Sequence, residues 1–88
     1  MVKCVINGQN MTSRALAHQE IAKALALPVV YGSNLDALWD VVSTFDADMT
    51  LVNAGAMLNA LQVYGCNLIA TLYEAAETNK KFVFHVED

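Results

Sequence analysis

The chain has 88 residues, of which 56% are hydrophobic, and a formal net charge of −4 at pH 7. This length and apolar content predict one folded domain, residues 1–88, with a single core, and they exclude an intrinsically disordered chain. The net negative charge argues against a nucleic acid or an anionic membrane as partner and favours a basic protein.

Cysteine and histidine usage argues against disulfides, metal sites and cofactors. The two cysteines make no disulfide framework, so we interpret Cys4 as a strand core residue and Cys66 as packing at a helix start. His18 and His85 have no Cys or His neighbour at the spacing of metal ligands. The sequence opens directly into strand-like residues, without a signal peptide or a run of membrane-spanning length. We therefore expect a cytoplasmic protein without a metal or cofactor.

The first third of the chain predicts a strand followed by a helix. Residues 2–6 are typical of a strand, and an Asn-Gly turn pair follows them. Thr12 or Ser13 can cap a helix that continues until Pro28 ends it. We place His18 on the solvent-exposed surface of this helix.

A second helix begins at Ser33 or Asn34, either of which can cap free backbone N–H groups. At about 100° per residue, one arc of this helix is apolar and faces the core. That arc comprises Leu35, Leu38, Trp39 and Val42. Asp36 and Asp40 lie beside the arc, one turn apart, so the helix has a core face and an acidic face.

The acidic face is unfavourable for the helix itself. Like charges four residues apart destabilise a helix by about 0.2–0.5 kcal/mol. The helix dipole offsets this for Asp36 in the first turn, but Asp40 has low helix propensity and lies near the negative end. Two interpretations stay open: two solvated aspartates, or a functional site at which a local rule is broken.

The second half of the chain predicts two more helices between two more strands. In order, we expect a strand at 49–53, a short helix at 54–62, a helix from about 66 to 78, and a strand at 82–86. Met57 is expected in the core, and Tyr64-Gly65 is expected to break the chain between the helices. The last strand is almost continuously apolar, which favours a strand covered on both faces.

The element order predicts an α/β fold. Helical connections between strands imply a parallel three-stranded sheet with right-handed crossovers, packed with about four helices. The sequence does not determine the strand order.

No residue pattern favours catalysis. The closest carboxylate pair, Asp36 and Asp40, lies on adjacent turns of an exposed helix, which makes a poor catalytic cleft. The five Lys and Arg residues are scattered, which excludes a basic surface for nucleic acid. Acidic groups flanked by Tyr31, Trp39 and Phe45 instead have the composition of a protein–protein interface. Trp39 is as consistent with a core tryptophan as with an interface anchor, and at the core edge it could serve both purposes.

Residues 31–40, Tyr-Gly-Ser-Asn-Leu-Asp-Ala-Leu-Trp-Asp, resemble the signature of the barstar family of small intracellular inhibitors of microbial ribonucleases. Residues 5–8 and 24–28 also resemble the family's first strand and the end of its first helix. Glu74 falls where the family carries an acidic contact residue, whereas 46–66 resembles the family only in element order. The resemblance implies a barstar-like fold over nearly the whole chain.

The resemblance also implies how such a protein binds. Asp40 would occupy the place of a substrate phosphate in the nuclease active site, Asp36 would pair with a basic group there, and Glu74 would contact a basic residue at the rim. The residues expected to bind the partner are Val30, Tyr31, Asn34, Leu35, Asp36, Ala37, Trp39, Asp40, Ser43, Thr44, Phe45 and Glu74.

Two positions depart from the family pattern. Val30 stands where the best-known member has an aromatic residue that stacks in the nuclease site, and Phe45 replaces a tryptophan. Two functions therefore stay open, beside an unrecognised enzyme or a different binding role. One is inhibition of a basic, secreted-type ribonuclease by a protein that is monomeric when free. The other is an interaction module of barstar fold whose basic partner is not a ribonuclease.

Overall fold

The sheet consists of three parallel strands in the order β1-β2-β3, as the computed structural model shows for residues 2–28 and 31–87. The strands are β1 (Val2–Asn7), β2 (Ala47–Val52) and β3 (Phe82–Val86). In the register, Val5 lies beside Thr50, which in turn lies beside His85. The expected parallel sheet is confirmed, and the strand order follows the order of the chain.

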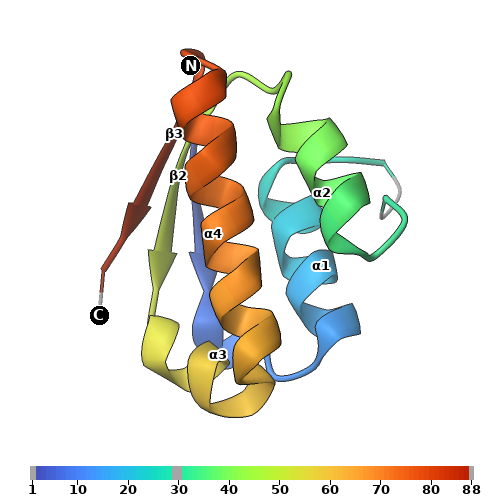
Figure 1. The fold of residues 1–88 in the computed structure, drawn as a ribbon, viewed down its shortest axis with the longest axis vertical. Helices are drawn as coiled ribbons and strands as arrows, with labels where there is room; N and C mark the ends of the chain where they lie inside the picture. The colour runs from blue at the N-terminus through green and yellow to red at the C-terminus, as the bar shows by residue number, and fades with distance from the viewer. Residues whose placement is uncertain (1, 29–30, 88) are drawn as a thin grey trace.

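Two α-helices lie in each connection between neighbouring strands. A short 3-10 turn, η1 (Gly8–Asn10), then α1 (Arg14–Ala24) and α2 (Leu35–Val42) connect β1 to β2, and α3 (Ala54–Leu61) and α4 (Val63–Thr78) connect β2 to β3. Figure 1 shows the long helix α4 in front of the sheet, with α1 and α2 beside it. The described part of the chain therefore confirms an α/β fold with four α-helices.

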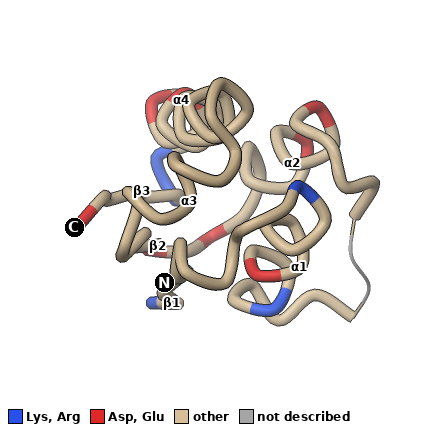
Figure 2. Tube along the Cα trace, turned by 90° about the horizontal axis from the view of Figure 1, so that it is seen from below, with Lys and Arg blue, Asp and Glu red and all other residues tan. Residues whose placement is uncertain are grey.

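The helices cover only one face of the sheet (Figures 1 and 2). Every second side chain of β2 is buried: Ala47, Met49 and Leu51. Between them Asp48 is only half-buried, and on β1 Val5 is 59% exposed. The expectation that β3 is covered on both faces is wrong, because Phe82 and Phe84 are buried whereas His85 is exposed. Its apolar run reflects two aromatic residues on the inner face together with half-buried valines.

The core lies between the sheet and the helices. Buried side chains from both layers form it: Ile6, Met49, Leu51, Phe82 and Phe84 from the strands, and Ile21, Leu38, Met57, Leu68 and Leu72 from the helices. Removing this apolar surface from water is the main favourable contribution to folding. The expectation that Met57 lies in the core is confirmed.

The first helix, α1, ends earlier than Pro28. Ala26 has a positive φ of 56°, and the N–H of Leu27 donates to the carbonyl of Ala22 at 3.0 Å. A left-handed residue followed by this backward hydrogen bond is the usual Schellman ending of a helix. The other end agrees with expectation, since Ser13 is the N-cap and its Oγ accepts from the N–H of Leu16 at 3.1 Å.

The prediction that Tyr64-Gly65 breaks the chain before α4 is wrong. Tyr64 and Gly65 lie inside α4, and the chain turns instead at Gln62, whose φ is 56° and ψ −126°. Gly65 is buried, and a Cβ on it would lie 3.3 Å from Leu58 Cδ2 and 3.4 Å from Leu61 Cβ. The glycine therefore allows close packing of α4 on α3 and does not end a helix.

The two thiols are free. Cys4 is half-buried against the core, and burial, with a smaller contribution from Asp48, raises the pKa of its thiol. Cys66 is exposed, so the expectation that it packs at a helix start is wrong. Within the described residues, no helix is long and apolar enough to cross a membrane.

Candidate functional site

The start of α2 is fixed by Asn34. Its Oδ1 accepts a hydrogen bond from the N–H of Ala37 at 2.8 Å, and its Nδ2 donates to the carbonyl of Gly32 at 3.0 Å. Ser33 has a positive φ of 52° and is not the cap. Of the two capping candidates, Asn34 is therefore confirmed. Its two hydrogen bonds hold the preceding loop against the first turn of the helix.

The two faces of α2 differ as the sequence predicts. Leu38 and Val42 are fully buried, while Leu35 and Trp39 are half-buried against the core. The helix packs against α4. A side chain at the core edge can both stabilise the fold and present one edge to a partner, which keeps both interpretations of Trp39 open.

The acidic side chains of α2 point away from this packing. Asp36 and Asp40 are exposed, and neither carboxylate has an ion-pair or hydrogen-bond partner within residues 2–28 and 31–87. They are therefore available to an external cation.

The acidic residue expected on the neighbouring helix is also accessible. Glu74 is exposed on α4. In Figure 2, the acidic positions of α2 and of α4, in red, lie on two helices of the same layer, and residues that are not charged, in tan, lie between them. The exposure of all three carboxylates is confirmed, while their use as one binding surface stays a prediction.

The far end of α2 is held by Asn79, the residue that follows α4. Asn79 Nδ2 donates to the carbonyl oxygens of Val42 at 3.1 Å and Phe45 at 2.9 Å. The hydroxyls of Ser43 and Thr44 bond to carbonyls within the helix itself. The turn after α2 is thus fixed to the turn before β3, and no local sequence signal shows this pairing.

The position predicted for His18 is wrong. His18 is fully buried, and its Nδ1 lies 2.8 Å from the Tyr31 hydroxyl and its Nε2 2.7 Å from the Tyr64 hydroxyl. The guanidinium of Arg14 lies 4.4 Å from the centre of the Tyr64 ring. Burial lowers the pKa of the His18 imidazole, and burial, then the nearby Tyr64, raises the pKa of the Tyr31 phenol.

A signal in the sequence could have revealed this burial. The buried residues of α1 are Ala17, His18, Ile21 and Ala22. His18 is three residues before Ile21 and four before Ala22, so it has the spacing of the apolar stripe itself. Its polar character led to the surface assignment.

The predicted contact residues lie on one chain segment and one neighbouring helix. Asn34, Asp36, Asp40, Thr44 and Glu74 are exposed; Tyr31, Leu35, Ala37, Trp39, Ser43 and Phe45 are half-buried; Val30 lies outside the described residues. The described ones, except Glu74, come from α2 and its two flanking loops. The arrangement offers acidic, hydroxyl and aromatic groups to a partner.

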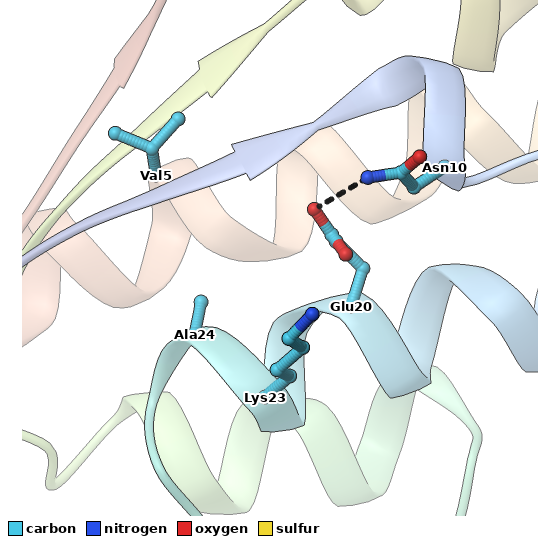
Figure 3. Close-up of a pocket in the computed structure, with 5 residues that line it drawn as sticks. All are labelled: Val5, Asn10, Glu20, Lys23 and Ala24. Atoms are coloured by element: carbon cyan, nitrogen blue, oxygen red, sulfur yellow. Dashed lines mark hydrogen bonds between the residues drawn. The ribbon is translucent and has the colours of Figure 1, made fainter.

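A depression elsewhere has its polar groups partly engaged within the chain. It measures about 260 Å³ between β1 and α1, and Val5, Asn10, Glu20, Lys23 and Ala24 line it (Figure 3). Glu20 Oε2 accepts from the backbone N–H of Asn7 at 2.9 Å and from Asn10 Nδ2 at 3.4 Å. The described residues contain no cluster of three His, Cys, Asp or Glu side chains that could hold a metal. The depression therefore contributes no binding group to the acidic face of α2.

Comparison with known proteins agrees with the geometry. The family described as Barstar (barnase inhibitor) matches residues 1–88. A Bacillus subtilis (strain 168) protein named "Putative ribonuclease inhibitor YrdF" is 32% identical over 83 residues, which cover 91% of this chain and 91% of that protein. The family resemblance of residues 31–40 is therefore confirmed.

Proposed function

The chain belongs to the barstar family, and from this premise we propose that it is a protein inhibitor of a microbial ribonuclease. It would place α2 and the loop at residues 31–34 in the nuclease active site. The observation that carries the proposal is that Asp36 and Asp40 are exposed and that their carboxylates have no partner within the described residues. Binding therefore does not need to break an internal ion pair.

The chemistry of a ribonuclease site suits these carboxylates. Such a site already holds the phosphates of its substrate, so carboxylates on a rigid helix can accept the same charge-assisted hydrogen bonds. Asp40 would take the place of a phosphate, Asp36 would pair with a basic group in the site, and Glu74 would contact a basic residue at the rim. The inhibitor needs no catalytic group, metal or cofactor of its own.

Fixed geometry supports the same mode of binding. Asn34 caps the start of α2, Leu38 and Val42 anchor its buried face, and Asn79 holds its end. A surface that is ordered before binding loses less conformational freedom on association. The carboxylates are thus presented on a helix that is held at both ends.

The partner would be a basic protein. The chain's net charge of −4 favours encounter with a cationic surface and makes association sensitive to salt. We also propose that the free protein is a monomer in the cytoplasm, where it would protect the producing cell from a basic, secreted-type ribonuclease.

A second function is favoured by the reduced aromatic surface. Val30 and Phe45 replace larger aromatic residues of the family pattern, and Trp39 and Phe45 are half-buried against the core. Less ring surface is then available for stacking in a nuclease site. The same acidic helix would serve an interaction module for a basic protein that is not a ribonuclease.

The experiment that separates these functions combines inhibition with capture. Purified protein is titrated into barnase with an RNA substrate, and immobilised protein is incubated with source-cell lysate at low salt and then eluted at high salt. Stoichiometric inhibition, or elution of a basic nuclease, supports the ribonuclease inhibitor. A basic non-nuclease in the eluate without inhibition supports the second function, and RNA turnover by the pure chain contradicts both.

A further inference from the structure

His18 connects three parts of the fold. It belongs to α1, Tyr31 precedes the loop that leads into α2, and Tyr64 lies in the first turn of α4. Both ring nitrogens of His18 are within hydrogen-bond distance of a tyrosine hydroxyl, and the rings of both tyrosines meet the imidazole edge-on, at 5.3 and 6.0 Å between centroids. Among the described residues, His18 is the single polar side chain of the buried set.

The hydrogen-bonding capacity of these groups is matched. A neutral imidazole offers one N–H donor and one lone pair, and a phenol hydroxyl can donate or accept. The two tyrosines therefore satisfy both nitrogens of the buried ring, whichever tautomer it adopts. A buried polar group with all its partners in place specifies one arrangement of the segments that it joins.

The link from His18 to the acidic helix is short. Only Gly32 and Ser33 separate Tyr31 from the cap residue Asn34, and Asn34 Nδ2 is bonded to the carbonyl of Gly32. A displacement of Tyr31 would therefore pass directly to the N-cap of α2. The position of the cap in turn sets the direction in which the first turn presents Asp36.

We propose that His18 is a positioning residue for the nuclease-binding helix: by holding the Tyr31 hydroxyl, it fixes the loop at residues 31–34 and thereby the orientation of Asp36 and Asp40. The inference rests on the proposed function for its consequence in binding. The part of the inference that His18 fixes the loop at residues 31–34 concerns the free protein alone.

The chain provides a matched control in Tyr64. The Tyr64→Phe variant removes a hydrogen bond of nearly equal length to the same imidazole. However, Tyr64 belongs to a helix that packs closely on α3 through Gly65, and the predicted contact residue of that helix, Glu74, lies ten positions further along it and not in the loop before α2. Tyr64→Phe should therefore lower the Tm without changing the loop.

Four variants test the inference: Tyr31→Phe, His18→Gln, their combination, and Tyr64→Phe. Gln at position 18 places its amide near the position of Nε2. The variant therefore loses the hydrogen bond to Tyr31, while the amide can still bond the Tyr64 hydroxyl. Two quantities are measured for each: the Kd for barnase, and the hydrogen-exchange rate of the Ala37 amide in the free protein, since that amide reports on the Asn34 cap.

We expect Tyr31→Phe and His18→Gln each to weaken binding by about three- to tenfold, the effect of losing one hydrogen bond, and to accelerate exchange at Ala37. The combined variant should be no weaker than either single variant, because both remove the same link. Tyr64→Phe should leave both quantities as in the wild type.

Three results would overturn the positioning role. Equal weakening by Tyr64→Phe would show that His18 acts only through overall stability. Additive losses in the combined variant would show that the Tyr31 hydroxyl contacts the partner directly. Unchanged Ala37 exchange in His18→Gln and Tyr31→Phe would show that the loop does not depend on His18. If wild-type protein fails to bind barnase, the proposed inhibition of that nuclease fails, and the exchange rates alone decide the positioning role.

Discussion

The side-chain amide of Asn79 donates a 2.9 Å hydrogen bond to the carbonyl of Phe45, a residue 34 positions earlier in the chain. The same amide reaches the carbonyl of Val42 at 3.1 Å. The last carbonyls of a helix have no partner within the helix and need one from outside. Asn79 therefore closes the end of α2 from the turn before β3.

Replacing Asn79 should destabilise the whole fold. In Asn79→Ala, the carbonyl of Phe45 loses this donor, the carbonyl of Val42 keeps only the N–H of Phe45 at 3.4 Å, and the N–H of Lys81 loses its acceptor. A part-buried group left without a partner costs about 1–3 kcal/mol, so urea unfolding should show a decrease of this size in the free energy of unfolding. Asn67→Ala, at an exposed position of α4, is the control. A decrease no larger than that of the control would show that Asn79 does not hold α2.

Removing the N-cap of α2 should weaken both the fold and binding. Asn34→Ala deletes the hydrogen bond to the Ala37 N–H, and loss of such a cap costs about 0.5–2 kcal/mol. Ser33→Gly is the matched control, since glycine accommodates the positive φ of 52° at that position without strain. Thermal unfolding and barnase inhibition are measured for both. A glycine variant that loses as much as Asn34→Ala would contradict the capping role of Asn34.

The buried His18 should make stability depend on pH. Burial lowers its pKa in the folded state, so below the ordinary value of about 6.5 the unfolded chain binds this proton more readily. The contribution is therefore complete above about pH 6.5 and is lost as the pH falls toward the lower, folded-state pKa. The groups facing the imidazole are the hydroxyls of Tyr31 and Tyr64, with Arg14 over the Tyr64 ring.

Urea unfolding at pH values from 7.5 to 5 measures this dependence. The slope for the wild type approaches at most about 1.4 kcal/mol per pH unit for one group. We expect a shallower slope for His18→Gln than for the wild type. Parallel curves for wild type and His18→Gln would contradict the origin of the effect in His18.

Association with a cationic nuclease should depend on salt. Electrostatic steering raises association rates by about tenfold or more at low salt, and screening removes that gain. Stopped-flow mixing with barnase at 50 and 500 mM NaCl should show the association rate falling about tenfold, with a smaller change in dissociation. An association rate independent of salt would mean that the acidic side chains do not guide the encounter.

Sequence patterns determined the elements better than their boundaries. The acidic helix was predictable because its apolar positions and the Asn34 cap are both local. The helix break was misplaced because Tyr64-Gly65 has the composition of a turn, whereas Gly65 serves the packing of α4 on α3. Close approach between two helices is a tertiary property, and a glycine in the sequence does not show whether it serves such packing or a turn.

The site was predictable in its exposed part and not in its support. Asp36 and Asp40 follow from helical periodicity, and the family resemblance gives them a role. The carbonyls that the Asn79 amide bonds in the α2 turn, and the tyrosines that flank His18, lie at least 13 positions away along the chain, so no local pattern connects them. The open face of the sheet was missed for a related reason: the pattern of β3 does not distinguish large buried side chains on one face from the half-buried Val83 on the other.

The most direct test of the central claim is the pair of Kd and Tm values for Asp40→Ala, beside those for Glu87→Ala. In the free protein Asp40 is exposed, lies one turn from Asp36 and has low helix propensity, so alanine should leave the Tm unchanged or slightly higher. In a complex the carboxylate would be desolvated among cations, and its loss should weaken barnase binding by about 2–5 kcal/mol. Glu87 is exposed and follows β3, away from α2. The Glu87→Ala variant removes the same charge there and should change the affinity little. A large loss of affinity with an intact Tm for Asp40→Ala alone is the expected result. Equal affinity loss in both variants, or a marked fall in the Tm of Asp40→Ala, would contradict the claim that α2 presents this carboxylate to a nuclease.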